Sequence, residues 1–310
     1  MQKKIIAIYE NEGWFATLKK EMSKRQLTIE GHFLNETIIE IDGKSEDAIY
    51  FNRLSASSPS RNHHYSLKAG EQYVNWLEEQ GRQVINGTSA MQLEQSKFRQ
   101  YRALRDFEIR TPKSIFVTGG KQQLSLASEE LNFPFIYKPD CGGKGLGVKK
   151  IANESDWHDF LEKLSVNPEL SSTHILQEYI ISADQKITRC EFIAGKFHYA
   201  IDVSTKQGFE LCPAEACIPK SSCNLEAEAS LFSLAHDVDH KLIQSYEALL
   251  AKVKVPVAGI EFVRDNRGVI YTYDINCNTN YAPDIEAQVE TPAMQKIVEY
   301  LRYLQTGGQL

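Results

Sequence analysis

The sequence lacks a hydrophobic run long enough to cross a membrane, and it lacks an excess of basic residues. A spanning helix needs about 20 consecutive apolar residues, and no segment of the 310 residues comes near this length. The chain starts with a short strand-like run rather than the apolar core of a signal peptide. The formal net charge of −6 argues against a general nucleic-acid-binding protein. We therefore expect a cytosolic protein without a membrane or nucleic-acid partner.

Cysteine is scarce as well, with six residues in the whole chain. This is too few for a fold held together by disulfides. Cys212, Cys217 and Cys223 lie near one another in the sequence, but they lack the paired C-x-x-C spacing of a zinc site. With 42% hydrophobic and 25% charged residues, the chain has the composition of a globular protein with two or three cores.

Strands and helices alternate in the first third of the sequence. Apolar runs that predict buried strands occur at residues 5–9, 48–51 and 83–85. Apolar residues at helical spacing between these runs occur at 14–22 and 73–77. Because such alternation favours a mostly parallel sheet, residues 1–90 are predicted to form a Rossmann-like domain.

The remaining two thirds mix helices and strands in another order. Helices are predicted over 93–107, 153–164, 226–251 and 294–301. Strands are predicted over 114–117, 133–138, 148–151, 175–180, 189–193, 197–203, 258–264 and 269–275. The last two strands flank the turn Asp265–Gly268, as in a hairpin. The predicted fold class is therefore α/β (α+β).

A glycine-rich loop separates two of the predicted strands. Four glycines fall within six positions, at Gly142, Gly143, Gly145 and Gly147. Each costs about 1 kcal/mol of stability relative to alanine in a regular element. Their clustering therefore indicates that the function of this loop requires backbone without side chains. Amides without Cβ neighbours wrap a phosphate, and Lys144 in the loop would add positive charge. The alternative is a flexible hairpin tip.

The flanks of this loop decide which kind of phosphate site is expected. The loop does not match Gly-x4-Gly-Lys-Ser/Thr, and no helix follows it as in a dinucleotide-binding fingerprint. Its strands instead predict an antiparallel hairpin, which acts as a flap over phosphates and excludes water from a reactive intermediate.

Three oxygen-bearing side chains lie on the two strands of the downstream hairpin. Asp274 and Asn276 are two residues apart, so on a strand they project from the same face. Glu261 joins them if the turn pairs the two strands. Oxygen ligands of this kind suit Mg²⁺, which completes its shell with water and nucleotide phosphates. A solvated acidic strand face is the alternative.

With these motifs in place, the sequence resembles the ATP-grasp superfamily, and within it the RimK-like group of ribosomal-protein glutamate ligases and their relatives. The resemblance covers about residues 48–286 and depends on the order of the motifs along the chain. It implies an N-terminal pre-ATP-grasp domain over 1–90, followed by two subdomains over 91–180 and 181–310 that sandwich ATP.

The resemblance also assigns roles to single residues. Lys97 and Lys138 are similar to the two lysines that contact the ATP phosphates. Arg189 is similar to the arginine that clamps the γ-phosphate and later the acylphosphate, and it is expected to be catalytic together with Lys138. Glu261, Asp274 and Asn276 match the pattern of metal ligands. The residues that resemble the adenine-binding hinge are Gln177, Glu178, Tyr179 and Ile180.

What such proteins do follows from these roles. The resemblance implies ATP and Mg²⁺, with two ions expected, and a reaction in which a carboxylate becomes an acylphosphate and is joined to an amine. The alternatives are an ATP-grasp phosphotransferase that acts on a hydroxyl and an ATP-binding regulatory protein without turnover. Similar enzymes often self-associate, so a homo-oligomer is compatible with the resemblance.

Two segments bear on the substrate. Residues 202–217 depart from the glutamate-ligase pattern, so they either bind an amine or cation through Asp202, Glu210 and Glu215, or form a crossing loop. Arg53 and Arg61 belong to a polar stretch that either contacts a substrate carboxylate or is a surface loop. Both questions stay open at this level.

Overall fold

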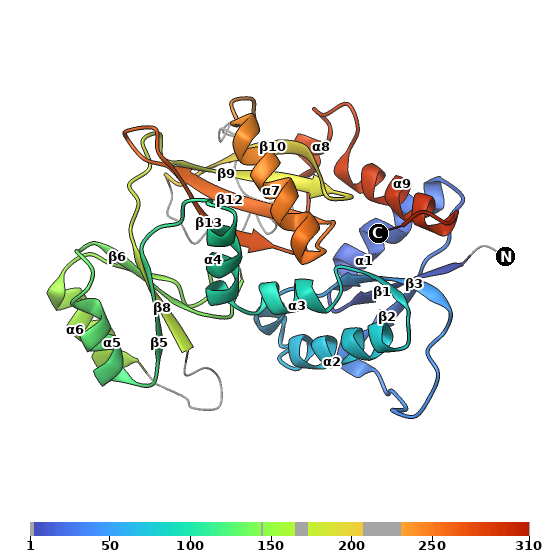
Figure 1. Ribbon diagram of the computed structural model, residues 1–310, viewed down its shortest axis with the longest axis horizontal. Helices are drawn as coiled ribbons and strands as arrows, with labels where there is room; N and C mark the ends of the chain where they lie inside the picture. Colours follow the sequence, from blue (N-terminus) through green and yellow to red (C-terminus); the bar gives the residue numbers. More distant parts are fainter. Residues whose placement is uncertain (1–2, 144, 165–172, 207–230, 310) are drawn as a thin grey trace, which may run out of the picture.

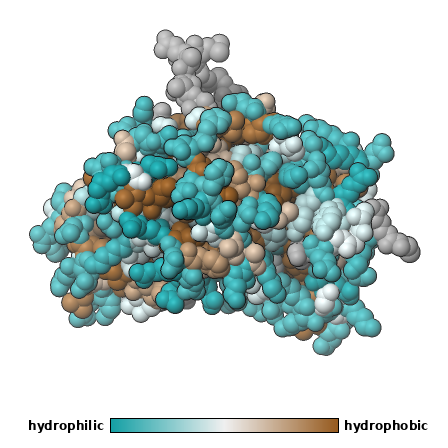
Figure 2. Space-filling model, turned by 45° about the horizontal axis from the view of Figure 1, so that its top comes forward, coloured by the Kyte–Doolittle hydropathy of each residue, from teal (hydrophilic) through white to brown (hydrophobic). Residues whose placement is uncertain are grey.

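The computed structural model describes residues 3–143, 145–164, 173–206 and 231–309. These residues form three sheets with helices packed on them (Figure 1). On the face shown in Figure 2, hydrophilic side chains predominate and hydrophobic ones gather in small groups between them. No helix in the described part of the chain is both long and apolar enough to cross a membrane.

The first sheet is parallel and is buried on both faces. Its strands lie in the order β2 (Glu30–Phe33), β1 (Lys4–Tyr9), β3 (Ala48–Arg53), β4 (Gln83–Ile85). Ile6 and Ile8 of β1 pack toward helix α2, whereas Ile5 and Ala7 pack toward α1 and α9. These helices are α1 (Glu12–Lys24), α2 (Ser66–Glu79) and α9 (Ala293–Gln305). The predicted parallel sheet is confirmed; β2 escaped prediction because Glu30 to His32 are not hydrophobic.

The second sheet is antiparallel and carries the glycine loop. Its order is β5 (Ser114–Thr118), β8 (Thr173–Glu178), β6 (Phe135–Pro139), β7 (Lys149–Ile151). Helices α5 (Lys121–Ser128) and α6 (Glu154–Lys163) pack on it through Leu124, Trp157 and Leu161. Because β6 and β7 pair antiparallel, the hairpin predicted around the glycines is confirmed.

The third sheet is also antiparallel. Its order is β11 (Phe232–Ala235), β10 (Lys196–Ser204), β9 (Lys186–Ile193), β12 (Ala258–Arg264), β13 (Ile270–Asn276). Helices α4 (Lys97–Asp106) and α7 (His240–Val253) share its core through Leu104, Tyr246 and Leu249. The short elements that complete the described chain are η1 (Leu34–Glu36), η2 (Ser58–Arg61), α3 (Thr88–Glu94) and α8 (Pro283–Glu286).

Two predicted helices differ from the structure. The helix predicted over 226–251 begins only at His240, because residues 232–235 pair with β10 and the Asp239 side chain caps the helix by accepting from the Lys241 amide at 2.9 Å. Residues 226–230 lie outside the described part. The helix predicted over 93–107 is two helices, since the Ser96 side chain accepts from the Arg99 amide and starts α4 anew.

Asn86 joins the first sheet to the third. It follows β4 with a φ of +54°, a left-handed conformation that asparagine tolerates better than most residues. Its Nδ2 donates to the carbonyls of Val257 and Cys277 at 2.7 and 2.5 Å, and its Oδ1 accepts from the Val257 amide at 3.2 Å. Asn86 is only 1% exposed, so these three hydrogen bonds are shielded from water.

We expect Asn86→Ala to lower the free energy of unfolding by about 2–3 kcal/mol, because it leaves buried backbone groups of Val257 and Cys277 without partners. Urea unfolding at 25 °C measures this change. Asn75→Ala is the matched control, because Asn75 is exposed on α2 and its side chain bonds only to Glu79. Equal stability of the two variants would contradict the proposed role of Asn86.

Candidate functional site

A cavity of about 280 Å³ is lined by segments from all three sheets. The lining comes from the loop after β3, the start of α4, the glycine hairpin, the end of β8, and strands β9, β12 and β13. Ten of the twelve predicted site residues between Lys97 and Arg189 line it, and so do the three predicted metal ligands; Lys144 lies outside the described residues. Gly147 is the one placed residue that does not line the cavity.

The glycine loop lies over this cavity. Gly142, Gly143 and Gly145 line it, and Gly145 and Gly147 have φ values of +68° and +77°, which disfavour any other residue. A Cβ on Gly143 would come within 2.8 Å of the Ser57 amide nitrogen. A residue without a side chain is therefore required at Gly143, where the glycine loop contacts the segment after β3 that carries Ser57.

The predicted hinge residues form one wall. Gln177 is buried, and its amide group donates to the Ser114 and Tyr101 hydroxyls, each at 2.8 Å. Glu178 is exposed and accepts from the Lys113 amide at 3.2 Å. Tyr179 and Ile180 line the cavity after them.

Lys138 is a buried cation at the centre of the site. Its Nζ donates to the Gln177 side chain at 3.0 Å and to the Tyr101 hydroxyl. Burial, together with the positive charge of Lys97, lowers the pKa of Lys138 to about 7. Tyr101, one helical turn after Lys97, was not predicted as a site residue, although its i, i+4 spacing from that lysine places both on one face of α4.

The three predicted metal ligands come together on β12 and β13. The strands pair so that Glu261 lies opposite Asp274, and Gly259 lies opposite Asn276. Glu261 accepts from the Tyr273 hydroxyl at 3.0 Å and from the Asn276 amide at 3.5 Å. Burial and the neighbouring Asp274 carboxylate raise the pKa of Glu261 to about 7. Two half-buried carboxyl groups side by side fit a divalent cation, which would relieve this raised pKa.

Lys97 takes part in the same cluster. Its ammonium group forms an ion pair with Asp274, and it is one of the buried residues of the cavity lining. The cluster thus combines a phosphate-binding candidate with a metal-binding candidate. Among the described residues, no three His, Cys, Asp or Glu side chains lie together in a way suited to a metal. The predicted site has two carboxylates, Glu261 and Asp274, and its third candidate ligand is the side-chain amide of Asn276.

Arg189 lies on β9, opposite Glu261 of β12. Its Nε donates to Glu191 at 2.6 Å and its Nη2 donates to the Asn280 carbonyl at 3.2 Å. Glu191 is completely buried, and the Arg189 side chain passes so close to Gly259 that a Cβ there would lie 3.2 Å from Arg189 Cδ. Glu191 was missed at the sequence level, although it lies two residues after Arg189 and therefore on the same strand face.

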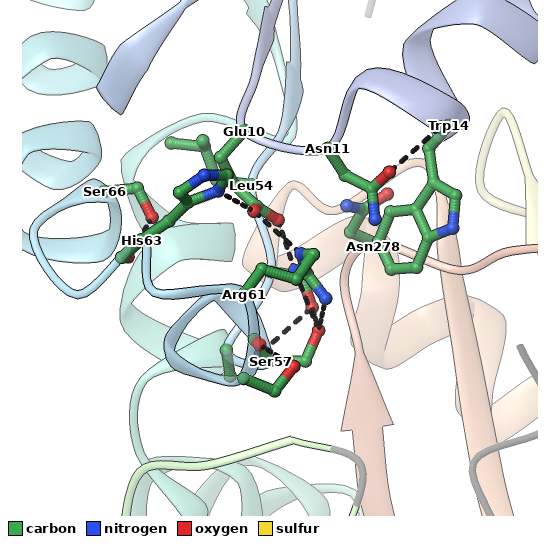
Figure 3. A network of polar contacts seen from close by, with 12 residues as sticks. Glu10, Asn11, Trp14, Leu54, Ser57, Arg61, His63, Ser66 and Asn278 are labelled. Atoms are coloured by element: carbon green, nitrogen blue, oxygen red, sulfur yellow. Dashed lines mark hydrogen bonds and ion pairs between the residues drawn. The ribbon is translucent and has the colours of Figure 1, made fainter. Parts of the chain in front are cut away.

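The two arginines of the polar stretch have partners within the protein. Arg53 is 3% exposed and donates to the Thr279 carbonyl at 3.2 Å, so it does not belong to a surface loop. Arg61 forms an ion pair with the buried Glu10, as Figure 3 shows. Ser55 and Ser57 of this stretch line the cavity.

Residues 202–217 are the segment that departs from the glutamate-ligase pattern. Only residues 202–206 of this segment lie within the described part of the chain. Asp202 lies on β10 and pairs with Lys186 at 2.7 Å and with the Thr188 hydroxyl at 2.6 Å. Glu210 and Glu215 lie outside the described residues. The carboxylate of Asp202 is therefore engaged with its own sheet.

Comparison with known proteins identifies the fold. No protein-family model and no curated protein matches the sequence. Solved structures do match: a RimK domain ATP-grasp protein from Sphaerobacter thermophilus has a TM-score of 0.67 at 12% identity, covering 96% of this chain and 99% of that one. The ATP-grasp ligase PsnB, complexed with a minimal precursor, has a TM-score of 0.66 at 14% identity, covering 98% and 100%.

A third match is D-alanine–D-alanine ligase from Bacillus anthracis, with a TM-score of 0.66 at 17% identity, covering 98% of this chain and 99% of that one. All three coverages are nearly complete, so the likeness includes the first sheet as well as the two antiparallel ones. The chain therefore has the ATP-grasp fold that the order of its motifs predicts.

Proposed function

We propose that this chain is an ATP-dependent, ADP-forming ligase that joins a carboxylate to an amine through an acylphosphate. The observation that carries the proposal is the convergence on one cavity of two lysines, an arginine, the glycine hairpin and the acidic hairpin. Lys97 and Lys138 supply positive charge for phosphates, and the backbone amides of the glycine hairpin supply neutral donors.

The acidic hairpin supports a metal site in the same place. Glu261, Asp274 and Asn276 would hold Mg²⁺ through oxygen atoms, and we propose two ions. When bound, Mg²⁺ neutralises charge on the phosphates that undergo transfer. Lys97, which is paired with Asp274 in this structure, is then available for a phosphate oxygen.

Arg189 has the geometry of a clamp. The described residues take up two of its five N–H donors, through Glu191 and the Asn280 carbonyl, and these hold the guanidinium in place. The remaining donors suit the oxygens of a carboxylate and then of an acylphosphate. The carboxylate oxygen attacks the γ-phosphorus and ADP leaves; the amine nitrogen then attacks the acyl carbon, phosphate leaves, and the amine proton passes to water.

The neighbours agree with this chemistry. D-alanine–D-alanine ligase and the ATP-grasp ligase PsnB are ligases by name, and PsnB is also solved with Mg and ADP. Their low identity leaves the substrates of this chain open. The hinge residues Gln177 to Ile180 are proposed to hold the adenine ring, because they line the cavity beside Lys138.

The central prediction concerns the products. ADP formation is expected to require both a carboxylate and an amine, because the acylphosphate is consumed only by a nucleophile. Hydroxylamine added in place of the amine is expected to yield an acyl hydroxamate, detected by its iron complex and by mass. A phosphorylated alcohol without any hydroxamate would overturn the ligase proposal in favour of a phosphotransferase.

A second prediction concerns the metal ligands. Asp274→Ala is expected to lower Mg²⁺-dependent ATP turnover by roughly 10²–10³-fold, because a ligand is lost and Lys97 loses its partner. Asp106→Ala is the control, since Asp106 is exposed and 3.9 Å from Arg102. Circular dichroism checks the fold of both variants. Unchanged turnover in Asp274→Ala would refute the metal assignment.

A third prediction uses the lowered pKa of Lys138. The ammonium form binds phosphate, and a pKa of about 7 means that this form is depleted above neutral pH. ADP affinity, measured calorimetrically with EDTA present to remove metal, is therefore expected to fall from pH 7.5 to 9, by at most roughly tenfold per pH unit. Lys138→Arg stays charged and is expected to reduce this slope. Equal slopes would contradict a phosphate contact by Lys138.

A further inference from the structure

We propose that Arg53, the last residue of β3 in the first sheet, is a positioning residue for Arg189 of the third sheet. Arg53 holds the backbone of Thr279, and the segment around Thr279 holds the Arg189 guanidinium, together with Glu191, in the orientation that binds the γ-phosphate. The inference rests on the proposed function, in which Arg189 is the clamp. It adds a residue from a different sheet that does not itself line the cavity.

Arg53 is buried and contacts the segment that follows β13. It is 3% exposed, and its guanidinium carbon lies 5.4 Å from the centroid of the Phe51 ring, on the same face of β3. Its carbonyl accepts from Asn278 Nδ2 at 2.5 Å, and its Nη2 donates to the Thr279 carbonyl at 3.2 Å. One residue of the first sheet therefore fixes two consecutive residues after β13.

Arg189 is hydrogen-bonded to the next residue of this segment. Its Nη2 donates to the Asn280 carbonyl at 3.2 Å. The carbonyls of Thr279 and Asn280 thus accept from two arginines that belong to different sheets. Because only two soft dihedral angles separate neighbouring peptide groups, a displaced Thr279 carbonyl displaces the Asn280 carbonyl as well. Loss of the Arg53 bond would therefore shift the group that holds Arg189.

Side chains connect Thr279 to the clamp as well. A Cβ atom on Gly259 would lie 2.6 Å from Thr279 Cγ2, 3.2 Å from Arg189 Cδ and 3.3 Å from Glu191 Oε2. The three side chains therefore converge on β12 at Gly259, and no space is left there for a fourth. Thr279 is 2% exposed, and a close-packed interior transmits a shift of one side chain to its neighbours.

Glu191 supplies the negative charge of this cluster. It is completely buried, and its Oε1 accepts from Arg189 Nε at 2.6 Å. Its charge also acts on Arg53: burial lowers the pKa of the Arg53 guanidinium, and the nearby Tyr281 and Glu191 oppose this change. Arg53 Nη1 and Glu191 Oε2 are buried, and neither has a hydrogen-bond partner among the described residues. The two arginines thus share the field of one carboxylate.

The γ-phosphate is the part of the nucleotide that would sense this arrangement. A guanidinium binds a phosphate best through two parallel hydrogen bonds, so a small rotation of Arg189 weakens the contact. ADP has no γ-phosphate and does not use it. Loss of Arg53 is therefore expected to weaken the binding of an ATP analogue and to leave ADP binding unchanged.

Calorimetric titration with Mg-AMPPNP and Mg-ADP provides the test. The ratio of the two dissociation constants reports the contribution of the γ-phosphate. Arg53→Met is expected to reduce the preference for AMPPNP roughly tenfold, the effect of about one well-placed hydrogen bond, and to change ADP affinity by less than about twofold. Arg53→Lys keeps the charge without the planar fork and is expected to reduce the preference roughly threefold.

Arg82→Met is the matched control. Arg82 is a half-buried arginine of the same domain, and its guanidinium bonds to Ser45 and Asp47. Its loss is expected to lower the melting temperature and to leave the affinities for AMPPNP and ADP unchanged. A purely structural role of Arg53 would give this same pattern, or an equal loss of both affinities.

A double variant shows whether Arg53 acts through Arg189. Arg189→Met is expected to remove most of the preference for AMPPNP. Arg53→Met combined with Arg189→Met is expected to match Arg189→Met alone, because residues that act as one unit are not additive. A further loss as large as that of Arg53→Met alone would contradict action through Arg189 and would assign the effect to another group, such as Asn276.

The outcomes separate this inference from the proposed function. A wild-type ratio in folded Arg53→Met and Arg53→Lys overturns the role of Arg53 and leaves the ligase proposal intact. The same ratio in Arg53→Lys alone decides the question if Arg53→Met does not fold. An unchanged ratio in Arg189→Met overturns the clamp and this inference with it, whereas hydroxamate formation still tests the ligase. A folded wild-type protein that binds neither nucleotide overturns both proposals.

Discussion

The arrangement of the site depends on the register of one strand. β12 lies between β9 and β13, and its Glu261 is opposite Arg189 on one side and Asp274 on the other. Because side chains alternate along a strand, a shift by one residue would turn Glu261 away from both neighbours. The clamp, the proposed metal site and the cross-strand contact at Gly259 are therefore set by the register of β12 with its two neighbours.

Much of this arrangement could be predicted from the sequence because it is encoded locally. Asp274 and Asn276 share a strand face through simple alternation, and four glycines in six positions indicate a hairpin with special backbone. Asn278, Ser57 and Trp14 carry no such signal. They meet across more than 200 residues of sequence, and an isolated serine or asparagine has the same appearance in any loop. The strand β11 was missed because its pairing partner, not its composition, determines its structure.

Three cations near the cavity are held in ion pairs by carboxylates of the described residues. Arg189 is matched by Glu191, Arg61 by Glu10, and Lys97 by Asp274. Each pair avoids the large cost of an isolated buried ion. Lys138 is different, since its described hydrogen bonds go to a neutral hydroxyl and a neutral amide. Its charge is thus the one most readily compensated by an incoming phosphate, and its lowered pKa expresses the same imbalance.

The contact between Gly143 and Ser57 links two parts of the cavity that belong to different sheets. If the glycine hairpin moves to cover phosphates, it moves against the segment that carries Ser55 and Ser57, because a Cβ atom on Gly143 would lie only 2.8 Å from the Ser57 amide nitrogen. Thermodynamic linkage is reciprocal, so if occupancy of one part of the cavity changes the affinity of the other, the reverse effect has the same factor. The close contact at Gly143 is the place in this fold through which such a coupling would pass.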